Sequence, residues 1–318
     1  MSAAADVLTF GETMVSLRGH GPFKLGGSMD LSVAGAESNV AIGLARLGHR
    51  VRWAGSVGAD EAGELVLRTL RAESVDTSDV TRDAGAPTGL ILFEPRLPEV
   101  TRVQYYRAGS AGSRLTVEAV ERAFAAGPPP RVLHLTGITP ALSASARDAC
   151  RRALRLAHAR GVLVSVDANY RSQLWSSPAA AEELRGWMPY VDLLIASDDE
   201  LPLCAPPPGE ADPVKALLEL GVREVVVKLG AEGAVGHTDE GELRVPARPV
   251  RAVDAVGAGD AFVAGYLSAW LDGEGLEGRL DRAVTTGAFA VAQVGDWEGA
   301  PTRGELGLLG VGAGVVVR

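Results

Sequence analysis

Cysteine is nearly absent from this sequence, since Cys150 and Cys204 are the only two in 318 residues. Two distant cysteines exclude a disulfide framework and a cysteine-rich zinc site, and they favour a reduced compartment. The N-terminus has no basic region followed by an apolar core, and no run of about 18 apolar residues occurs anywhere. We therefore expect a cytoplasmic protein with no secretion signal and no membrane-spanning segment.

An excess of positive charge is also missing. The formal net charge is −9 and the isoelectric point is about 5.2, with no basic stretch, which argues against nucleic acid or an anionic membrane as a partner. No Gly-Lys pair occurs, so there is no Gly-x-x-x-x-Gly-Lys phosphate loop, and protein-kinase motifs are missing too. The five histidines have no metal-ligand spacing.

Short apolar runs alternate with helical patterns along most of the chain. The 47% hydrophobic content of 318 residues is enough for a large core. The alternation predicts an α/β fold with a mostly parallel sheet flanked by helices, which binds its ligands at the C-terminal ends of the strands. Strands are expected at 7–10, 51–56, 132–135, 163–167, 193–196 and 224–229, and helices at 61–72, 143–160, 179–187, 212–220 and 280–294.

Two regions interrupt this alternation. Residues 13–33 and 88–106 lack a long helical period and are typical of extended segments joined by turns. One large domain with a small appendage is consistent with this pattern.

A glycine-rich turn near the C-terminal end carries the strongest chemical signal. Asp254-Ala255-Val256-Gly257-Ala258-Gly259-Asp260 leads directly into an apolar helical pattern. Gly257 and Gly259 allow a ligand to approach the backbone closely, and the free N–H groups of a helix start favour an anion. Asp260 stands where it could take a proton from an attacking hydroxyl. Taken alone, Gly-Ala-Gly could equally be an ordinary loop before a buried helix.

A second glycine-rich segment, Ala34-Gly35-Ala36-Glu37-Ser38-Asn39-Val40-Ala41, is followed by Gly48 and Gly58. Together, the two segments resemble the signature motifs of the phosphofructokinase-B, or ribokinase-like, family of carbohydrate kinases. The resemblance runs from the opening strand with Gly11-Glu12 to Gly295-Asp296. It implies a three-layer ribokinase-like fold in which residues 1–318 form one kinase domain. A small β-sheet lid would come from roughly 12–33 and 87–108.

The resemblance also implies roles for individual residues. Asp260 would be the catalytic base, and the backbone of Gly257, Ala258 and Gly259 would stabilise the transferring phosphate of ATP. The other residues implied to contact the nucleotide are Asn169, Arg171, Ser197, Lys228, Gly230 and Gly233. Glu200 would help to hold Mg²⁺, and a monovalent cation is a further option. A homo-oligomer is expected as well.

Ser197-Asp198-Asp199-Glu200 departs from the family pattern, which has asparagine where Ser197 stands. One carboxylate acting partly through water suffices for Mg²⁺, so Glu200 can still serve. A helix start with serine followed three residues later by glutamate explains the same four residues equally well.

The substrate is indicated by residues that resemble those of 2-keto-3-deoxygluconate kinases within the family. A sugar acid carries a carboxylate, which the planar guanidinium groups of Arg107 and Arg171 could bind. The other residues expected to contact the sugar are Gly35, Ala36, Asn39, Tyr105, Asp260 and Asp296. Ile91 stands where close relatives are expected to have tyrosine, which weakens the substrate assignment without affecting the kinase assignment.

We therefore predict an ATP-dependent sugar-acid kinase that phosphorylates a hydroxyl of 2-keto-3-deoxygluconate. A fructokinase or another small-sugar kinase of the same family is the alternative. A sugar- or nucleotide-binding protein without catalysis is a third option, because a fold does not determine a function. Retention of Asp260 in its glycine-rich context argues against that option.

Overall fold

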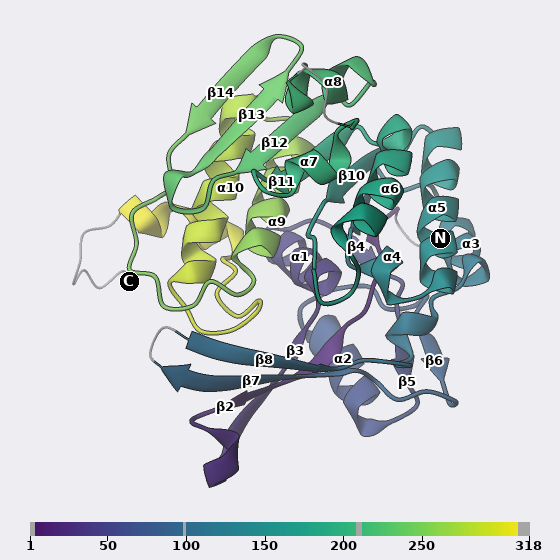
Figure 1. The fold of residues 1–318 in the computed structure, drawn as a ribbon, viewed down its shortest axis with the longest axis vertical. Coiled ribbons are helices and arrows are strands. Elements are labelled where there is room, and N and C mark those ends of the chain that lie inside the picture. The colour runs from purple at the N-terminus through teal and green to yellow at the C-terminus, as the bar shows by residue number, and fades with distance from the viewer. Residues whose placement is uncertain (1–3, 98–99, 208–211, 311–318) are drawn as a thin grey trace.

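The computed structural model describes residues 4–97, 100–207 and 212–310 (Figure 1). Its largest sheet has eight strands in the order β14-β13-β12-β11-β10-β9-β1-β4. The six strands from β12 to β4 in this order are parallel, and β13 and β14 are antiparallel additions at one edge. Their bounds are β1 Val7–Thr9, β4 Val51–Trp53, β9 Val132–Thr136, β10 Leu163–Asp167, β11 Leu193–Ser197, β12 Glu224–Lys228, β13 Ala234–Thr238 and β14 Gly241–Val245.

Helices cover both faces of this sheet, which gives three layers. One buried cluster lies under α1 (Ala36–Arg46), α2 (Glu61–Ala72), α9 (Ala258–Leu271) and α10 (Leu276–Val291). The other lies under α3 (Val117–Ala125), α5 (Ala144–Ala159), α6 (Ser177–Trp187), α7 (Leu201–Cys204) and α8 (Pro213–Glu219). The short helix α4 (Thr139–Leu142) follows β9. The predicted α/β class is thereby confirmed.

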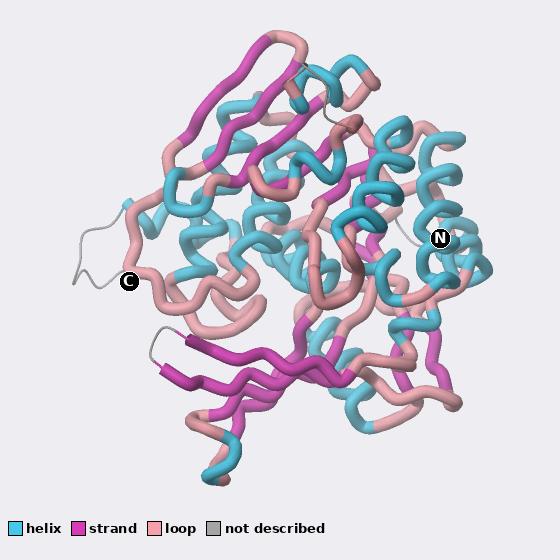
Figure 2. Tube along the Cα trace, viewed as in Figure 1, coloured by secondary structure: helices cyan, strands magenta, loops and turns pink. Residues whose placement is uncertain are grey.

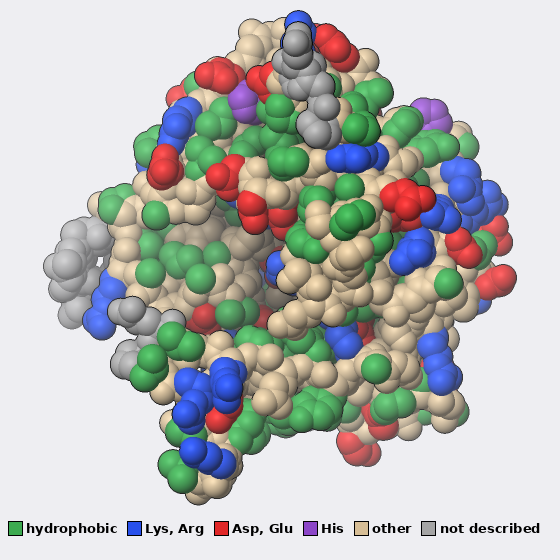
Figure 3. Space-filling model, in the orientation of Figure 1, with side chains coloured by type: hydrophobic (Ala, Val, Ile, Leu, Met, Phe, Trp, Pro, Cys, Tyr) green, Lys and Arg blue, Asp and Glu red, His purple; other side chains and the backbone are tan. Residues whose placement is uncertain are grey.

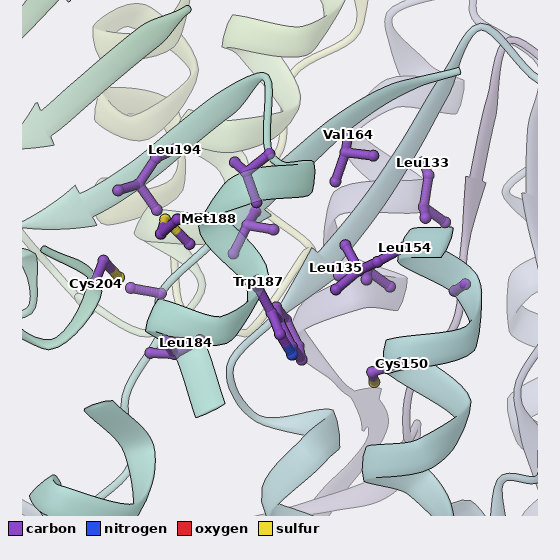
Figure 4. Close-up of a cluster of buried hydrophobic side chains, with 14 of the residues drawn as sticks. Leu133, Leu135, Cys150, Leu154, Val164, Leu184, Trp187, Met188, Leu194 and Cys204 are labelled. Atoms are coloured by element: carbon purple, nitrogen blue, oxygen red, sulfur yellow. The ribbon is translucent and has the colours of Figure 1, made fainter. Parts of the chain in front are cut away.

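The second cluster shows why the parallel strands are apolar on both sides. Leu135 of β9, Val164 of β10 and Leu194 of β11 point toward the helical layer, where Leu154 of α5 and Trp187 of α6 pack against them (Figure 4). A strand buried on both faces carries a continuous apolar run, and that is the pattern from which these strands were predicted.

A smaller sheet lies beside one end of the large one (Figure 2). Its strands β2 (Met14–Gly19), β3 (Met29–Ala34), β7 (Leu90–Leu97) and β8 (Val100–Tyr106) have the order β3-β2-β7-β8. The pairs β2/β3 and β7/β8 are antiparallel, whereas β2 and β7 pair in parallel. The short 3-10 helix η1 (Phe23–Leu25) connects β2 to β3. The two interrupting regions of the sequence thus build one sheet.

The predicted strand 51–56 is wrong in one respect, because it divides at Gly55. β4 stays in the large sheet, while β5 (Ser56–Gly58) pairs with β6 (Thr81–Asp83) in a separate two-stranded sheet. A Cβ at Gly55 would overlap the Trp53 ring, so only glycine permits this bend. The predicted helix 280–294 is also shifted, since α10 spans Leu276–Val291.

Within the described ranges, we find no helix that combines the length and the apolar character needed to cross a membrane.

Candidate active site

A cavity of about 390 Å³ lies between the small sheet and the C-terminal ends of the parallel strands. In the space-filling view it is seen as a hollow above the small sheet, with charged side chains of both signs in and around it (Figure 3). Most of the residues predicted to bind ligands line it: Gly35, Ala36, Asn39, Tyr105, Arg107, Asn169, Arg171, Glu200, Lys228, Gly257, Gly259, Asp260 and Asp296. The fold therefore brings together side chains that are up to about 260 residues apart, from Gly35 to Asp296.

Four predicted residues lie outside the lining of this cavity: Ala258, Ser197, Gly230 and Gly233. Ala258 is the first residue of α9, and Ser197 is the last of β11. Gly230 begins the 3-10 turn η4 (Gly230–Glu232) and Gly233 follows it, with φ angles of 56° and 100°. The turn comes one residue after Lys228, at the C-terminal end of β12.

The glycine-rich turn reaches α9 through a left-handed residue. Gly257 has φ 73° and precedes α9, whose first turn has no side-chain cap. A Cβ at Gly257 would overlap the carbonyl oxygen of Asp296, so the turn requires glycine for both its dihedral angle and its space. Asp254 fixes the start of the turn by accepting the N–H of Val256 at 3.1 Å. Free N–H groups at the start of a 14-residue helix form a suitable place for an anion.

Asp260 lies in the first turn of α9 and is only 9% exposed. Its Oδ2 accepts a hydrogen bond of 2.8 Å from Nδ2 of Asn39 in α1. The two helices can come this close because Gly43 faces Ala264, where a Cβ would lie only 2.7 Å away. Burial raises the pKa of Asp260 to about 7, against the lowering effect of the Asn39 hydrogen bond. Such a carboxylate can accept a proton near neutral pH.

A second charged group lies at the ends of β10, β11 and β12. Nζ of Lys228 donates to Oδ1 of Asp167 at 2.7 Å. Burial alone would lower the pKa of Lys228, but the charges of Asp167 and Glu200 outweigh it and raise that pKa. Lys228 is therefore a fixed positive charge on the side of the cavity opposite the small sheet.

Glu200 and Asn169 provide the oxygen atoms at this edge. Oε1 of Glu200 accepts the N–H of Tyr170 at 2.7 Å, and Oε2 accepts the N–H of Ser197 at 2.9 Å. Asn169 has an unusual positive φ of 38°, and its Oδ1 is buried with no hydrogen-bond partner among the residues that the structure describes. The Ser197 hydroxyl donates to Asp199, and the next helix, α7, begins at Leu201 with Glu200 as its N-cap, so the alternative of a helix start at Ser197 is wrong.

No cluster of three or more His, Cys, Asp or Glu side chains able to hold a metal occurs in 4–97, 100–207 and 212–310. Mg²⁺ usually keeps several waters and needs only one or two protein carboxylates alongside phosphate oxygens. Glu200 retains lone pairs beyond its two hydrogen bonds, and the unpaired Oδ1 of Asn169 is a hard oxygen ligand. This donor set fits Mg²⁺ bound together with a nucleotide.

The two predicted carboxylate-binding arginines differ in their surroundings. Nε of Arg107 donates to Oε2 of the buried Glu12 at 2.6 Å, and Nη2 forms an ion pair with the same oxygen at 2.6 Å. One edge of the Arg107 guanidinium therefore already faces a carboxylate of the protein itself. Arg171 is exposed, and the only hydrogen bond of its side chain within the described residues is to the carbonyl of Tyr170 at 3.3 Å. Arg171 thus supplies the uncompensated positive charge.

Three charged residues in or near the cavity had no predicted role: Glu12, Glu37 and Arg18. Glu12 and Glu37 line the cavity, and Glu37 accepts hydrogen bonds of 2.6 Å from Thr136 and Thr139. Burial raises the pKa of Glu37 above its usual value. Arg18 of β2 lies 3.7 Å from Asp296. Glu12 and Glu37 follow glycines that were noted in the sequence, which is a signal that could have identified them.

Asp296 lies in the loop after α10 and is 8% exposed. Burial raises its pKa to about 7, and the neighbouring Arg18 opposes that rise. The small sheet completes the cavity with apolar side chains, among them Ile91 and Phe93 of β7 and Val103 of β8. Ile91 thus contributes an apolar wall at the position where a phenol was expected.

The chain belongs to the pfkB family of carbohydrate kinases, which residues 4–303 match. It is 38% identical to the 2-dehydro-3-deoxygluconokinase of Bacillus subtilis (strain 168), over 95% of this chain and 94% of that one. The enzyme of the same name from Thermoproteus tenax is 35% identical, over 95% and 93% of the two chains. The crystal structure of a PfkB protein from Polaromonas sp. JS666 is 37% identical, covers 95% of this chain and 99% of its own, and superposes with a TM-score of 0.84.

Proposed function

We propose that this carbohydrate kinase transfers the γ-phosphoryl group of ATP to the terminal hydroxyl of 2-keto-3-deoxygluconate, also called 2-dehydro-3-deoxygluconate. The observation that carries the proposal is a single cavity in which Asp260, the glycine-rich turn and two arginines face one another. Relatives named for this activity, at 38% and 35% identity over nearly the whole chain, support it.

Asp260 is the base in this mechanism. The sugar hydroxyl gives its proton to the Asp260 carboxylate as its oxygen attacks the γ-phosphorus, and the bond from that phosphorus to the β-γ bridging oxygen breaks. Asn39 holds the carboxylate through its 2.8 Å hydrogen bond, which leaves the second oxygen, Oδ1, for the proton. Assistance by a positioned base is worth about 10² to 10⁴ in rate.

Stabilisation of charge contributes more than proton removal, because the transferring phosphoryl group requires little covalent chemistry. The N–H group of Ala258 donates to the carbonyl of Ala255 at 3.4 Å, so the N–H groups of Gly257, Gly259 and Asp260 are the ones that would face the developing charge. Loss of one such donor typically costs about 3 to 4 kcal/mol. Mg²⁺, held through Glu200 and Asn169, would neutralise phosphate charge when it is bound.

Lys228 and the turn from Gly230 to Gly233 are assigned to the nucleotide, together with Ser197 and Asn169. The support is their position at the C-terminal ends of β10, β11 and β12, across the cavity from the small sheet. Lys228 would place its charge beside the phosphates, with Asp167 orienting the ammonium group through their 2.7 Å bond.

The sugar is assigned to the other side, against the small sheet, which acts as a lid that excludes water. Gly35 and Ala36 offer the uncapped N-terminus of α1, and Tyr105, Arg107 and Asp296 complete the contacts. Arg171 is the main partner of the substrate carboxylate, because Arg107 shares its charge with Glu12. A cytoplasmic homo-oligomer, with a monovalent cation as an option, completes the proposal.

A fructokinase is the second candidate, and Ile91 favours it, since an apolar side chain replaces an expected polar contact. The two candidates are separated by measuring ADP release and kcat/KM for 2-keto-3-deoxygluconate, fructose and ribose with one enzyme preparation. A higher kcat/KM for the acid supports the proposal. A higher value for a neutral sugar replaces it with the second candidate, and no ADP release with any sugar would support a binding protein.

A further inference from the structure

Arg18 is a charged residue of the small sheet whose partners belong to other parts of the fold. Its Nη1 forms an ion pair of 3.0 Å with Oδ2 of Asp254, the first residue of the glycine-rich segment. Its guanidinium carbon lies 4.3 Å from the centre of the Phe93 ring, and its side chain is 16% exposed. A largely desolvated guanidinium thus connects β2 to the turn that precedes α9.

The second partner of Arg18 is Asp296. Nη2 of Arg18 lies 3.7 Å from Oδ2 of Asp296, which is too long for a hydrogen bond. That nitrogen is buried and has no hydrogen-bond partner within the described residues. A buried unpaired N–H is unfavourable, so a small approach of the two groups would be stabilising.

Both partners are tied to the glycine-rich turn. Asp254 accepts the N–H of Val256, and the carbonyl of Asp296 occupies the space that a side chain at Gly257 would need. The segment after Asp296 is also tied to the small sheet, because Nε1 of Trp297 donates to the carbonyl of Val33 in β3 at 3.1 Å. The small sheet, the turn and Asp296 therefore meet at one guanidinium.

We propose that Arg18 is a positioning residue: it couples the seating of the small sheet to the shape of the phosphate turn by holding Asp254 and Asp296. The charges of Asp254 and Asp260 are both close enough to act on Asp296. Without Arg18, three carboxylates would share a site that must receive the phosphates of ATP. The inference rests on the proposed roles of Asp260 and Asp296 in the reaction.

The test compares Arg18→Met, Arg18→Lys and the matched control Arg102→Met. Methionine keeps an apolar contact with Phe93 but no charge, and Arg102 is a 66% exposed arginine of the same sheet. Arg18→Met should lower kcat/KM for the sugar by roughly tenfold to a hundredfold, the range expected for charged hydrogen bonds. Arg18→Lys should recover only part of the loss. It restores the positive charge, but a single ammonium group cannot face two carboxylates as the planar guanidinium does. Arg102→Met should stay within about twofold of wild type, since an exposed pair contributes little.

Two further measurements separate positioning from a purely structural role. Low concentrations of guanidinium ion should restore part of the kcat/KM of Arg18→Ala, whereas sodium chloride at the same ionic strength should not. In the ligand-free protein, the amide of Val256 should exchange hydrogen faster in Arg18→Met than in wild type. Unchanged kcat/KM in Arg18→Met, or equal recovery with both salts, would overturn the inference.

All of these assays use whichever sugar the wild-type enzyme phosphorylates best. If that sugar is neutral, the proposed substrate fails while the test of Arg18 remains intact. If the acid is preferred and Arg18→Met retains wild-type kcat/KM with unchanged exchange at Val256, the inference about Arg18 fails alone.

Discussion

Replacing Asp260 with asparagine should abolish most turnover and, at neutral pH and above, make the protein more stable. Burial raises the pKa of this carboxyl from 3.8 to about 7. The ionised form of Asp260 therefore destabilises the folded state relative to the unfolded state. One pKa unit corresponds to about 1.4 kcal/mol, which puts the upper limit of that cost at about 4 kcal/mol. Asparagine keeps the shape of the side chain and can still accept from Asn39, but it carries no charge.

The sign of the pH dependence follows from linkage. In wild type, the folded state keeps its proton on Asp260 at pH values where the unfolded state has released it, so stability falls as pH rises from about 4 to about 7. The gain from Asp260→Asn should therefore be absent near pH 4 and complete above pH 7. We expect a gain between about 1 and 4 kcal/mol at pH 8, since the new amide also needs hydrogen-bond partners.

Urea unfolding of the ligand-free protein at pH 5, 6, 7 and 8 measures this difference, with Asp198→Asn at an exposed position as the control. In parallel, wild-type kcat/KM should rise with pH to a plateau above about 7, because the base acts only when ionised. The pKa of Asp296 is also raised to about 7, so the midpoint of this pH profile reflects the ionisation of both carboxyl groups. Near-wild-type kcat in Asp260→Asn, or a gain in stability that does not depend on pH, would refute the assignment of Asp260 as a buried base.

Four further substitutions test the other parts of the site. Arg171→Gln should reduce the ratio of kcat/KM for the sugar acid over fructose by roughly tenfold to a hundredfold, and equal losses for both sugars would contradict its role. Arg107→Gln should lower kcat/KM for both sugars, since it leaves the buried Glu12 carboxylate without its ion-pair partner. The double variant Arg107→Gln/Glu12→Gln should recover part of this loss. Lys228→Met should raise the KM for ATP more than the KM for sugar; equal small effects would place it away from the nucleotide. Gly257→Ala should lower the free energy of unfolding by more than about 1 kcal/mol and reduce kcat/KM, as chemical denaturation and initial rates would show.

The elements predictable from sequence are those whose signal is local. The helix Glu61–Ala72 and the strand Leu163–Asp167 have the predicted bounds, because caps and apolar runs act over a few residues. The strand 51–56 failed because its division depends on Gly55 packing against the Trp53 ring, a contact that periodicity does not report. The order of the eight strands also lies outside such signals, since it depends on the paths of the connections between them.

The residues of the site likewise divide into those with a local sequence signal and those without one. Asp260 and Gly257 could be identified because a glycine-rich turn at a helix start has a short-range signature. The pairing of Arg107 with Glu12 could not be predicted, because Glu12 lies 95 residues earlier in the chain and only the fold brings the two together. An arginine in a binding motif therefore indicates a positive charge at a position, but not whether that charge is free.

Ion pairing also explains how a protein with a net charge of −9 can bind a sugar acid and a nucleotide in one cavity. Asp167 and Glu12 each hold a cation in place, and Arg18 faces Asp254 and Asp296. The pairs of Asp167 with Lys228 and of Glu12 with Arg107 are close to neutral, and Arg18 faces two carboxylates, so we expect Arg171 and the N–H groups at the start of α9 to attract an anion. A buried carboxylate that pairs with a cation weakens the attraction of that cation for an anionic ligand. Its larger effect is to fix the orientation of the cation, which then cannot turn away from the cavity. We therefore expect geometry within the cavity, rather than the overall charge of the protein, to determine where anionic ligands bind.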